Sequence, residues 1–298
     1  MILPSDDIAW QTLPKNLHLS SPNENEERSG AHEFPLRAVS VVVVLCLGVV
    51  TVIFGWQWRE DLAEQECDNR LKAIGLALFN YFDTYHEFPP ARLDGHSWRV
   101  RMVPYLVSSP YYSNYRFEEP WNSDWNLQLE SLPLESWKME EPIICYPNLF
   151  WQCPGERQDE TVSHTAYLML VGPHAFGRKE KGIRWQEITD DPATTIAVAE
   201  TASHSIHWLQ PKDLEVETMS FQINDPEKPS ISSHHPHGPH VLFCDGTVAQ
   251  LGPDLPPEVL KAMITIDGGE KIVRDQNAPG GYHLEEETTT SEAADVQP

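Results

Sequence analysis

The feature that most constrains this chain is an uninterrupted apolar run from Ala38 to Trp56, AVSVVVVLCLGVVTVIFGW. The run carries no charge, and its hydroxyl side chains are those of Ser40 and Thr51. At ~1.5 Å rise per residue, such a helix spans roughly 28 Å, close to the hydrocarbon thickness of a bilayer. A soluble core helix is seldom apolar on every face for that length. The run therefore predicts a single membrane-spanning helix, placed at residues 37–58.

Two alternatives explain the run less well. A cleaved secretory signal would follow a short basic segment, whereas the residues before this run are mostly polar and more acidic than basic. A buried core helix would carry a polar stripe. Trp56, Trp58 and Arg59 suit a membrane–water boundary instead. Basic residues on the two sides nearly balance, so charge alone does not set the orientation.

Helical periodicity continues beyond the run to about Tyr85. Apolar residues recur at spacings of three and four and make one stripe: Leu71, Ile74, Gly75, Leu78 and Phe82. The pair Pro89-Pro90 is incompatible with a continuing helix. We therefore predict one helix from Ala38 to Tyr85, with residues 59–87 forming a stalk that packs on a head domain.

The remaining chain is predicted to be a β-rich, loop-rich head at residues 88–282, which makes the fold class α+β. We expect three strands, at Val100–Leu106, Tyr167–Val171 and Thr195–Ala199, and a helix at Pro256–Ile266. Residues 107–142 and 200–232 are expected to be loops. The ends, residues 1–36 and 283–298, are acidic and poor in apolar residues, which predicts a disordered leader and tail.

A hairpin signal stands near the end of the head. Two β-prone runs, Val241–Cys244 and Thr247–Leu251, flank the dipeptide Asp245-Gly246. We expect a type I′ turn, which needs positive φ at both of its central residues. The primary interpretation of Asp245 and Gly246 is therefore turn chemistry.

Composition narrows the function. The formal net charge of −24 argues against a nucleic-acid partner, because phosphate binding needs clustered Lys and Arg. The sequence has no Gly-x-Ser-x-Gly, no His-Glu-x-x-His and no phosphate-binding glycine loop. We expect no enzymatic activity; a metal-dependent hydrolase is the alternative. Cys46 lies in the apolar run, and the other four cysteines allow three full pairings.

Several motifs together resemble a known bacterial family. His235, then nine residues, then Asp245-Gly246, is similar to the signature near the C-terminus of proteins of the domain of unknown function 1559, a pseudopilin-like family expanded in planctomycetes. Further blocks occur in the family's order: Cys67–Leu78, Phe88–Ala91, Ser97–Val100 with Pro104–Leu106, Glu119–Trp121, Cys153-Pro154, and Trp208 with Pro211, Asp213 and Leu214. The resemblance covers roughly residues 60–275.

This resemblance implies an architecture like that of type IV pilins and type II secretion pseudopilins. The N-terminus would be cytoplasmic and the head would lie outside the cytoplasm. The implied role is structural or interactive in the cell envelope, with the bilayer bound through residues 38–56 and with homo-oligomers or envelope proteins as partners. The chain departs from the family pattern at residues 30–37, which lack the Gly-Phe-Thr processing site. We therefore expect the leader to be retained.

Candidate site residues follow from the same stretches. Four imidazoles lie within seven residues: His234, His235, His237 and His240. They are interpreted as a solvated loop with one structural histidine, and the alternative cofactor is a divalent metal ion. The many tryptophans are interpreted as head core; glycan binding is the alternative. For the disulfide we carry forward Cys67 and Cys153, which would tie stalk to head.

Overall fold

The structure is a computed structural model that describes residues 36–106, 111–129, 150–155, 163–202 and 206–285, with side chains from residue 44 onward. The chain divides into two units, residues 1–53 and 54–298. Apart from Leu36, the predicted leader lies outside the described residues, as does most of the predicted tail.

The predicted long helix is confirmed as α1, which runs from Leu36 to Tyr85 over 50 residues. Its described apolar side chains up to Trp58 are largely solvent-exposed, for example Phe54 at 66%. Among the helices in the described part of the chain, none combines the length and apolarity that crossing a membrane requires. The first residues of the predicted membrane run, 38–43, lie outside the residues whose side chains are described.

The second half of α1 is part of the core of the head. The predicted stripe is buried there: Leu71, Ile74 and Leu78 are at most 3% exposed. The helix ends before the predicted proline stop, because His86 takes a φ of +59° and its N–H donates to the carbonyl of Phe82 at 2.7 Å. A left-handed residue directly after a helix is a common way of closing its last turn.

A five-stranded sheet in the order β5-β3-β4-β6-β7 forms the centre of the head. The strand predicted at residues 167–171 is confirmed with its bounds unchanged, and the one predicted at 195–199 is confirmed one residue later. β3, β4, β6 and β7 pair antiparallel, whereas β5 pairs parallel to β3. The strands are β3 Tyr167–Val171, β4 Ile196–Glu200, β5 Leu214–Glu215, β6 His240–Phe243 and β7 Val248–Gln250.

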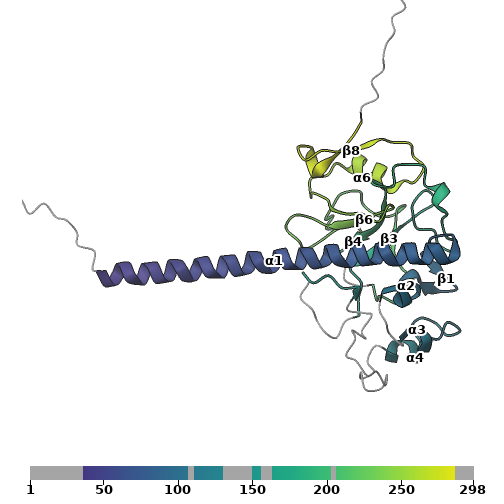
Figure 1. The fold of residues 1–298 in the computed structure, drawn as a ribbon, viewed down its shortest axis with the longest axis horizontal. Helices are drawn as coiled ribbons and strands as arrows, with labels where there is room; N and C mark the ends of the chain where they lie inside the picture. Colours follow the sequence, from purple (N-terminus) through teal and green to yellow (C-terminus); the bar gives the residue numbers. More distant parts are fainter. Residues whose placement is uncertain (1–35, 107–110, 130–149, 156–162, 203–205, 286–298) are drawn as a thin grey trace, which may run out of the picture. The chain divides into compact units, whose positions relative to one another are not determined.

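Both faces of this sheet are covered. On β3, Tyr167, Met169 and Val171 pack in the cluster that contains the α1 stripe. Leu168 and Leu170 alternate with them and pack in a second cluster with α6. In Figure 1, β3, β4 and β6 lie beside the second half of α1, with α6 beyond them. Burial on both faces explains why β3 and β4 are apolar without alternation.

The strand predicted at Val100–Leu106 is wrong, because the structure has a helix there, α2. Its buried positions include Trp98, Arg99, Met102 and Val103, which follow helical spacing. Arg99 is buried although it is charged, so the sequence pattern imitates the alternation of a strand. The helix predicted at 256–266 is confirmed as α6.

The predicted hairpin is confirmed, but its turn differs from type I′. Gly246 has a φ of +88°, whereas Asp245 is not at positive φ. Phe243 pairs with Thr247 across a three-residue loop, and the Gly246 N–H donates to the Phe243 carbonyl at 3.0 Å. A type I turn followed by a left-handed glycine also suits the right-handed twist of a hairpin.

Short elements complete the described part of the head. The strand β9 extends two residues into the range predicted as tail, and its partner is β8. The remaining elements are β1 Arg92–Leu93, β2 His96–Ser97, α2 Trp98–Leu106, α3 Tyr111–Asn114, α4 Asp124–Gln128, η3 Trp185–Glu187, α6 Pro257–Ile264, β8 Ile272–Arg274, η4 Pro279–Gly281 and β9 Tyr282–Leu284.

Candidate metal centre

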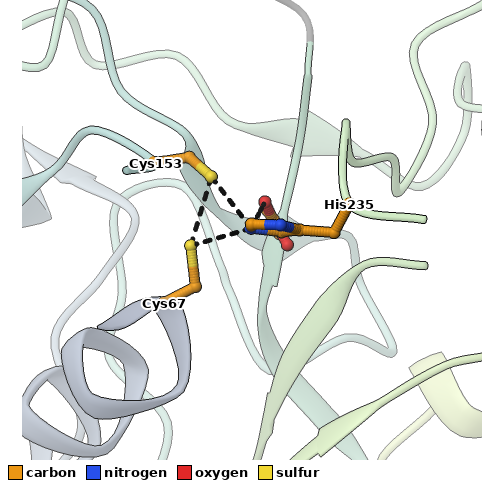
Figure 2. A group of neighbouring side chains, drawn as sticks. Cys67, Cys153 and His235 are labelled. Carbon is orange, nitrogen blue, oxygen red and sulfur yellow. Dashed lines mark hydrogen bonds and ion pairs between the residues drawn. The ribbon is translucent and has the colours of Figure 1, made fainter. Parts of the chain in front are cut away.

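Four ligand-type side chains meet where α1 joins the head. We call them the junction cluster: Cys67, Cys153, Glu200 and His235. One sulfur, nitrogen or oxygen atom from each lies within 4.8 Å of those of the others, and all four residues are buried. Figure 2 shows the two thiols and the imidazole of His235 pointing toward one another. The cluster joins a helix, a loop, a strand end and a second loop that are far apart in sequence.

The closest contacts converge on the two sulfurs. The Sγ atoms of Cys67 and Cys153 lie 3.1 Å apart, and each lies 3.2 Å from Nε2 of His235. The same Nε2 lies 3.6 Å from Oε1 of Glu200. These side chains are nearly inaccessible, with His235 at 1% and Glu200 at 2% exposed.

Local structure explains how each group reaches this point. Cys67 lies one turn before Leu71 on the buried stripe of α1. Gly155 follows the Cys153-Pro154 step, and a Cβ atom there would lie 2.6 Å from the His235 ring. The absence of that Cβ lets the loop close over the imidazole.

A hydroxyl group and a backbone amide hold the carboxylate of Glu200. The Ser233 hydroxyl donates to Oε1 at 2.8 Å and accepts from the His235 N–H at 3.0 Å. Oε2 accepts from the His240 N–H at 3.0 Å. Both carboxylate oxygens are therefore fixed by the loop that carries His235.

The pKa values of the two thiols are shifted in opposite directions. Hydrogen bonding from Cys153 lowers the pKa of Cys67 to about 6 against the effect of burial, with a further contribution from His235. That hydrogen bond to Cys67, together with burial, raises the pKa of Cys153 far above its ordinary value. Of the two thiols, Cys67 is therefore the one favoured as thiolate, and the Cys153 thiol is favoured as the donor between them.

The two other members of the junction cluster favour their charged forms. Burial works against the imidazolium of His235, but hydrogen bonding to Cys67 and the charge of Glu200 outweigh it and raise its pKa. Burial also opposes ionisation of Glu200, yet hydrogen bonds from His240 and the charge of His235 lower its pKa. The shifts of these two pKa values are thus mutually supporting, because each group lies beside the other in a buried position.

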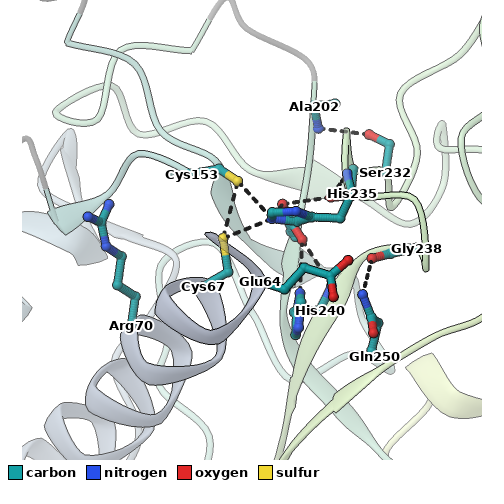
Figure 3. Close-up of polar contacts among 12 residues, drawn as sticks. Glu64, Cys67, Arg70, Cys153, Ala202, Ser232, His235, Gly238, His240 and Gln250 are labelled. Atoms are coloured by element: carbon teal, nitrogen blue, oxygen red, sulfur yellow. Dashed lines mark hydrogen bonds and ion pairs between the residues drawn. The ribbon is translucent and has the colours of Figure 1, made fainter. Parts of the chain in front are cut away.

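Two further contacts link α1 to the same loops. Glu64 accepts from Nδ1 of His237 at 2.9 Å. The guanidinium of Arg70 donates to the carbonyl of Gln152 at 2.5 Å. Figure 3 shows Glu64, Cys67 and Arg70, three positions apart along α1, near the junction cluster. Helix and head are thus joined over two turns of α1.

The predicted histidine set does not converge on one point. His235 enters the junction cluster, and Nδ1 of His240 lies 3.5 Å from Glu200. His237 is exposed and pairs with α1, and His234 is exposed. Cys67 and Cys153, carried forward as a disulfide pair, are in contact, and both thiols are free in the structure. Their bonding stays a prediction.

The other signature residues serve the turn and its packing. Oδ1 of Asp245 accepts from the N–H and the hydroxyl of Thr247 at 2.8 and 2.7 Å. Gly75 of α1 faces the hairpin, and a Cβ atom there would lie 2.9 Å from Leu242. The turn therefore packs on α1 where Gly75 and Gly246, which both lack a side chain, approach each other. These contacts support the structural interpretation of Asp245 and Gly246.

A buried ion pair connects two more of the sequence blocks. Arg99 donates to Asp213 at 2.7 Å, and Asp213 also accepts from the Trp98 indole and the Met169 N–H. Burial raises the pKa of Asp213, and Arg99 opposes that shift. Trp98 and two other tryptophans, Trp151 and Trp208, are fully buried, as expected of core residues. Trp137 lies outside the described residues.

Sequence reasoning missed Glu200. It directly follows the predicted strand 195–199, and its charge at the end of an otherwise apolar, doubly covered strand was the available signal. A carboxylate in that position needs a partner in the interior, and the partner, His235, could be identified only from the tertiary structure.

Helix and sheet share one core, so the chain belongs to the class of proteins in which a long N-terminal helix is an integral part of a β-sheet head. A model of the family described as "Protein of unknown function (DUF1559)" matches residues 64–210. The predicted family is thereby confirmed. The match includes Cys67, Cys153 and Glu200 and ends before His235. Comparison with curated proteins finds no match, and comparison with solved structures finds none.

Proposed function

We propose that this protein is a single-pass, membrane-anchored, pseudopilin-like component of the cell envelope with a structural or interaction role. The N-terminus would face the cytoplasm, and the head would meet its partners, envelope proteins or further copies of the chain, outside it. The proposal assigns the chain no catalytic activity. It rests on α1, which combines a fully apolar stretch with a stalk that is built into the head.

The exposure of apolar side chains along α1 is the observation that carries the proposal. Val44, Leu47, Val50, Ile53 and Trp56 are each at least 45% exposed. The sequence places no charge between Ala38 and Trp58. Soluble monomers rarely expose an apolar surface this continuous, so it needs a partner. A bilayer is the partner that matches an apolar surface on every side of a helix.

The test places charge in this stretch while keeping the helix. Val49 and Val52, at 58% and 60% exposed, are replaced by Arg in the variant V49R/V52R. Each central Arg costs about 2.5–3.5 kcal/mol of insertion free energy. Wild type is expected to stay in the membrane pellet through alkaline carbonate extraction, and the variant is expected to appear in the supernatant.

A matched control lies on the same helix. Leu76 is 63% exposed on the stalk, and L76R should leave membrane retention unchanged. Extraction of the wild type by carbonate would refute the anchor. Protease added to intact spheroplasts should digest the head, and protection of the head would refute the proposed orientation.

A further inference from the structure

The junction cluster has the composition and burial of a structural metal site. Two thiols, an imidazole and a carboxylate are the ligand types that Zn²⁺ uses in closed four-ligand sites. Ca²⁺ and Mg²⁺ prefer all-oxygen surroundings, which this site does not offer. All four residues are buried, so no coordination position opens to solvent.

Four of the six separations between the ligand atoms lie near the edges of a tetrahedron around one ion, and the two sulfur-to-carboxylate separations are within 4.8 Å. With Zn–S near ~2.3 Å and Zn–N or Zn–O near ~2.0–2.1 Å, tetrahedral edges are about 3.8 Å for S···S, 3.6 Å for S···N and 3.4 Å for N···O. The corresponding separations are 3.1, 3.2 and 3.6 Å. Each differs from its ideal by about 0.7 Å or less, which side-chain rotation can supply.

The supporting groups are also those of a metal site. Ser233 and the His240 N–H fix both oxygens of Glu200. Within the described residues, the buried Nδ1 of His235 has no hydrogen-bond partner, so the ring is held through Nε2, the atom that faces both sulfurs. Nε2 is therefore the ring nitrogen available to an ion, and the ring proton is left to Nδ1.

A hollow beside the cluster is lined by residues of α1, among them Glu66, and by Pro154 and Gly155, which directly follow Cys153. None of the four cluster side chains lines this hollow, so it ends short of the ligand atoms.

We propose that the junction cluster binds one Zn²⁺ as a closed structural site that fastens the α1 stalk to the head. Each ligand binds in its deprotonated form, so a proton carried by a ligand sulfur or by Nε2 is replaced by a bond to the ion and leaves to solvent; no redox partner is involved. This inference does not depend on the membrane anchor, because its readout is metal binding.

The experiment uses the full-length chain in detergent, reduced and freed of metal, with Co²⁺ as the probe. We expect about one Co²⁺ per chain, with the intense visible bands of tetrahedral Co²⁺ and a thiolate-to-metal charge-transfer band. Zn²⁺ should displace Co²⁺ and abolish these bands. Elemental analysis of chain purified without chelators should show about one zinc per chain.

Variants assign the ligands. C153S should remove about half of the charge-transfer intensity and weaken Co²⁺ binding at least ~100-fold, and S233A, which loses only a supporting group, should weaken it ~10–100-fold. The matched controls are C244S, a buried cysteine outside the cluster, and H237N, a histidine of the same loop. Both should bind Co²⁺ like the wild type, and circular dichroism verifies the fold of each variant.

Three results would overturn the proposal. One is a reduced wild-type chain that binds neither ion more tightly than about 10⁻⁵ M, far weaker than structural zinc sites. Another is Co²⁺ binding that C153S leaves unchanged. The third is a purified chain without zinc whose intact mass shows a Cys67–Cys153 disulfide, which would assign the pair to covalent linkage. If C153S does not fold, the wild-type Co²⁺ spectrum alone decides, since absence of thiolate charge transfer refutes the site.

Discussion

The buried pair of Arg99 and Asp213 should control the stability of the head. The Arg99 side chain is 0% exposed and the Asp213 side chain 3% exposed, so neither charged group is solvated by bulk water. Removing one partner of such a pair leaves an uncompensated buried charge and costs about 3–5 kcal/mol. In D213N the amide oxygen can still accept hydrogen bonds, and Arg99 keeps backbone carbonyl partners at Trp208, Gln210 and Lys212. We therefore expect the lower end, about 3 kcal/mol.

The assay is urea unfolding of the full-length chain in detergent, followed by tryptophan fluorescence. The fitted free energy of unfolding should fall by about 3 kcal/mol, and in a parallel thermal scan Tm should fall by roughly 6–12 °C for a domain of this size. The matched control is E180Q, which breaks the exposed Arg92–Glu180 ion pair and should cost less than about 1 kcal/mol. The double variant R99M/D213N should lose less than the sum of its single changes. A D213N loss no larger than that of E180Q would refute the reasoning.

Two more predictions concern packing and pH. G75A would place a methyl group against Leu242 of the β6–β7 hairpin and should cost about 1–3 kcal/mol of unfolding free energy. The control G55A, where a Cβ atom would meet nothing within 4 Å, should be neutral or slightly stabilising. Equal effects of the two variants in urea unfolding would contradict the close packing at Gly75. The Arg184 backbone N–H, together with the side chain of Arg178, lowers the pKa of Glu187 to about 2. The contribution of the Glu187 carboxylate to stability should therefore be complete above its ordinary pKa and be lost as the pH falls toward 2. The variant E187Q should flatten that part of an acid-unfolding profile. An unchanged profile would argue against this role of Glu187.

Elements with a strong local pattern could be predicted from the sequence. The helix to Tyr85, the strand Tyr167–Val171 and the Asp-Gly hairpin each carry their signal within a few residues. The α2 helix could not, because burial of Arg99 depends on Asp213, more than a hundred residues later. A sequence pattern cannot show that a charge faces inward when its partner is that distant.

The candidate site likewise contains residues that the sequence could indicate and a grouping that it could not. His235 and the two cysteines stood out by their residue types and motifs, but the local grouping of histidines suggested a loop site. The structure instead joins one histidine to residues of α1, of a distant loop and of β4. Such a set follows from how α1 lies along the sheet, which no local pattern records.

The sharing of one core by α1 and the sheet has a consequence for biogenesis. Cys67 and His235 are 168 residues apart in the chain, and Leu71 packs in the same core as Leu242. At ~5–20 residues per second, a ribosome needs roughly 10–30 s to deliver the second half of that core after the first has emerged. Before β3 and β4 emerge, the stalk stripe has no strand to cover it, and its cover stays incomplete until β6 follows. Until β6 arrives, the nascent chain therefore keeps an incompletely covered apolar stripe and a Cys67 without its neighbour His235, so the core closes only late in synthesis.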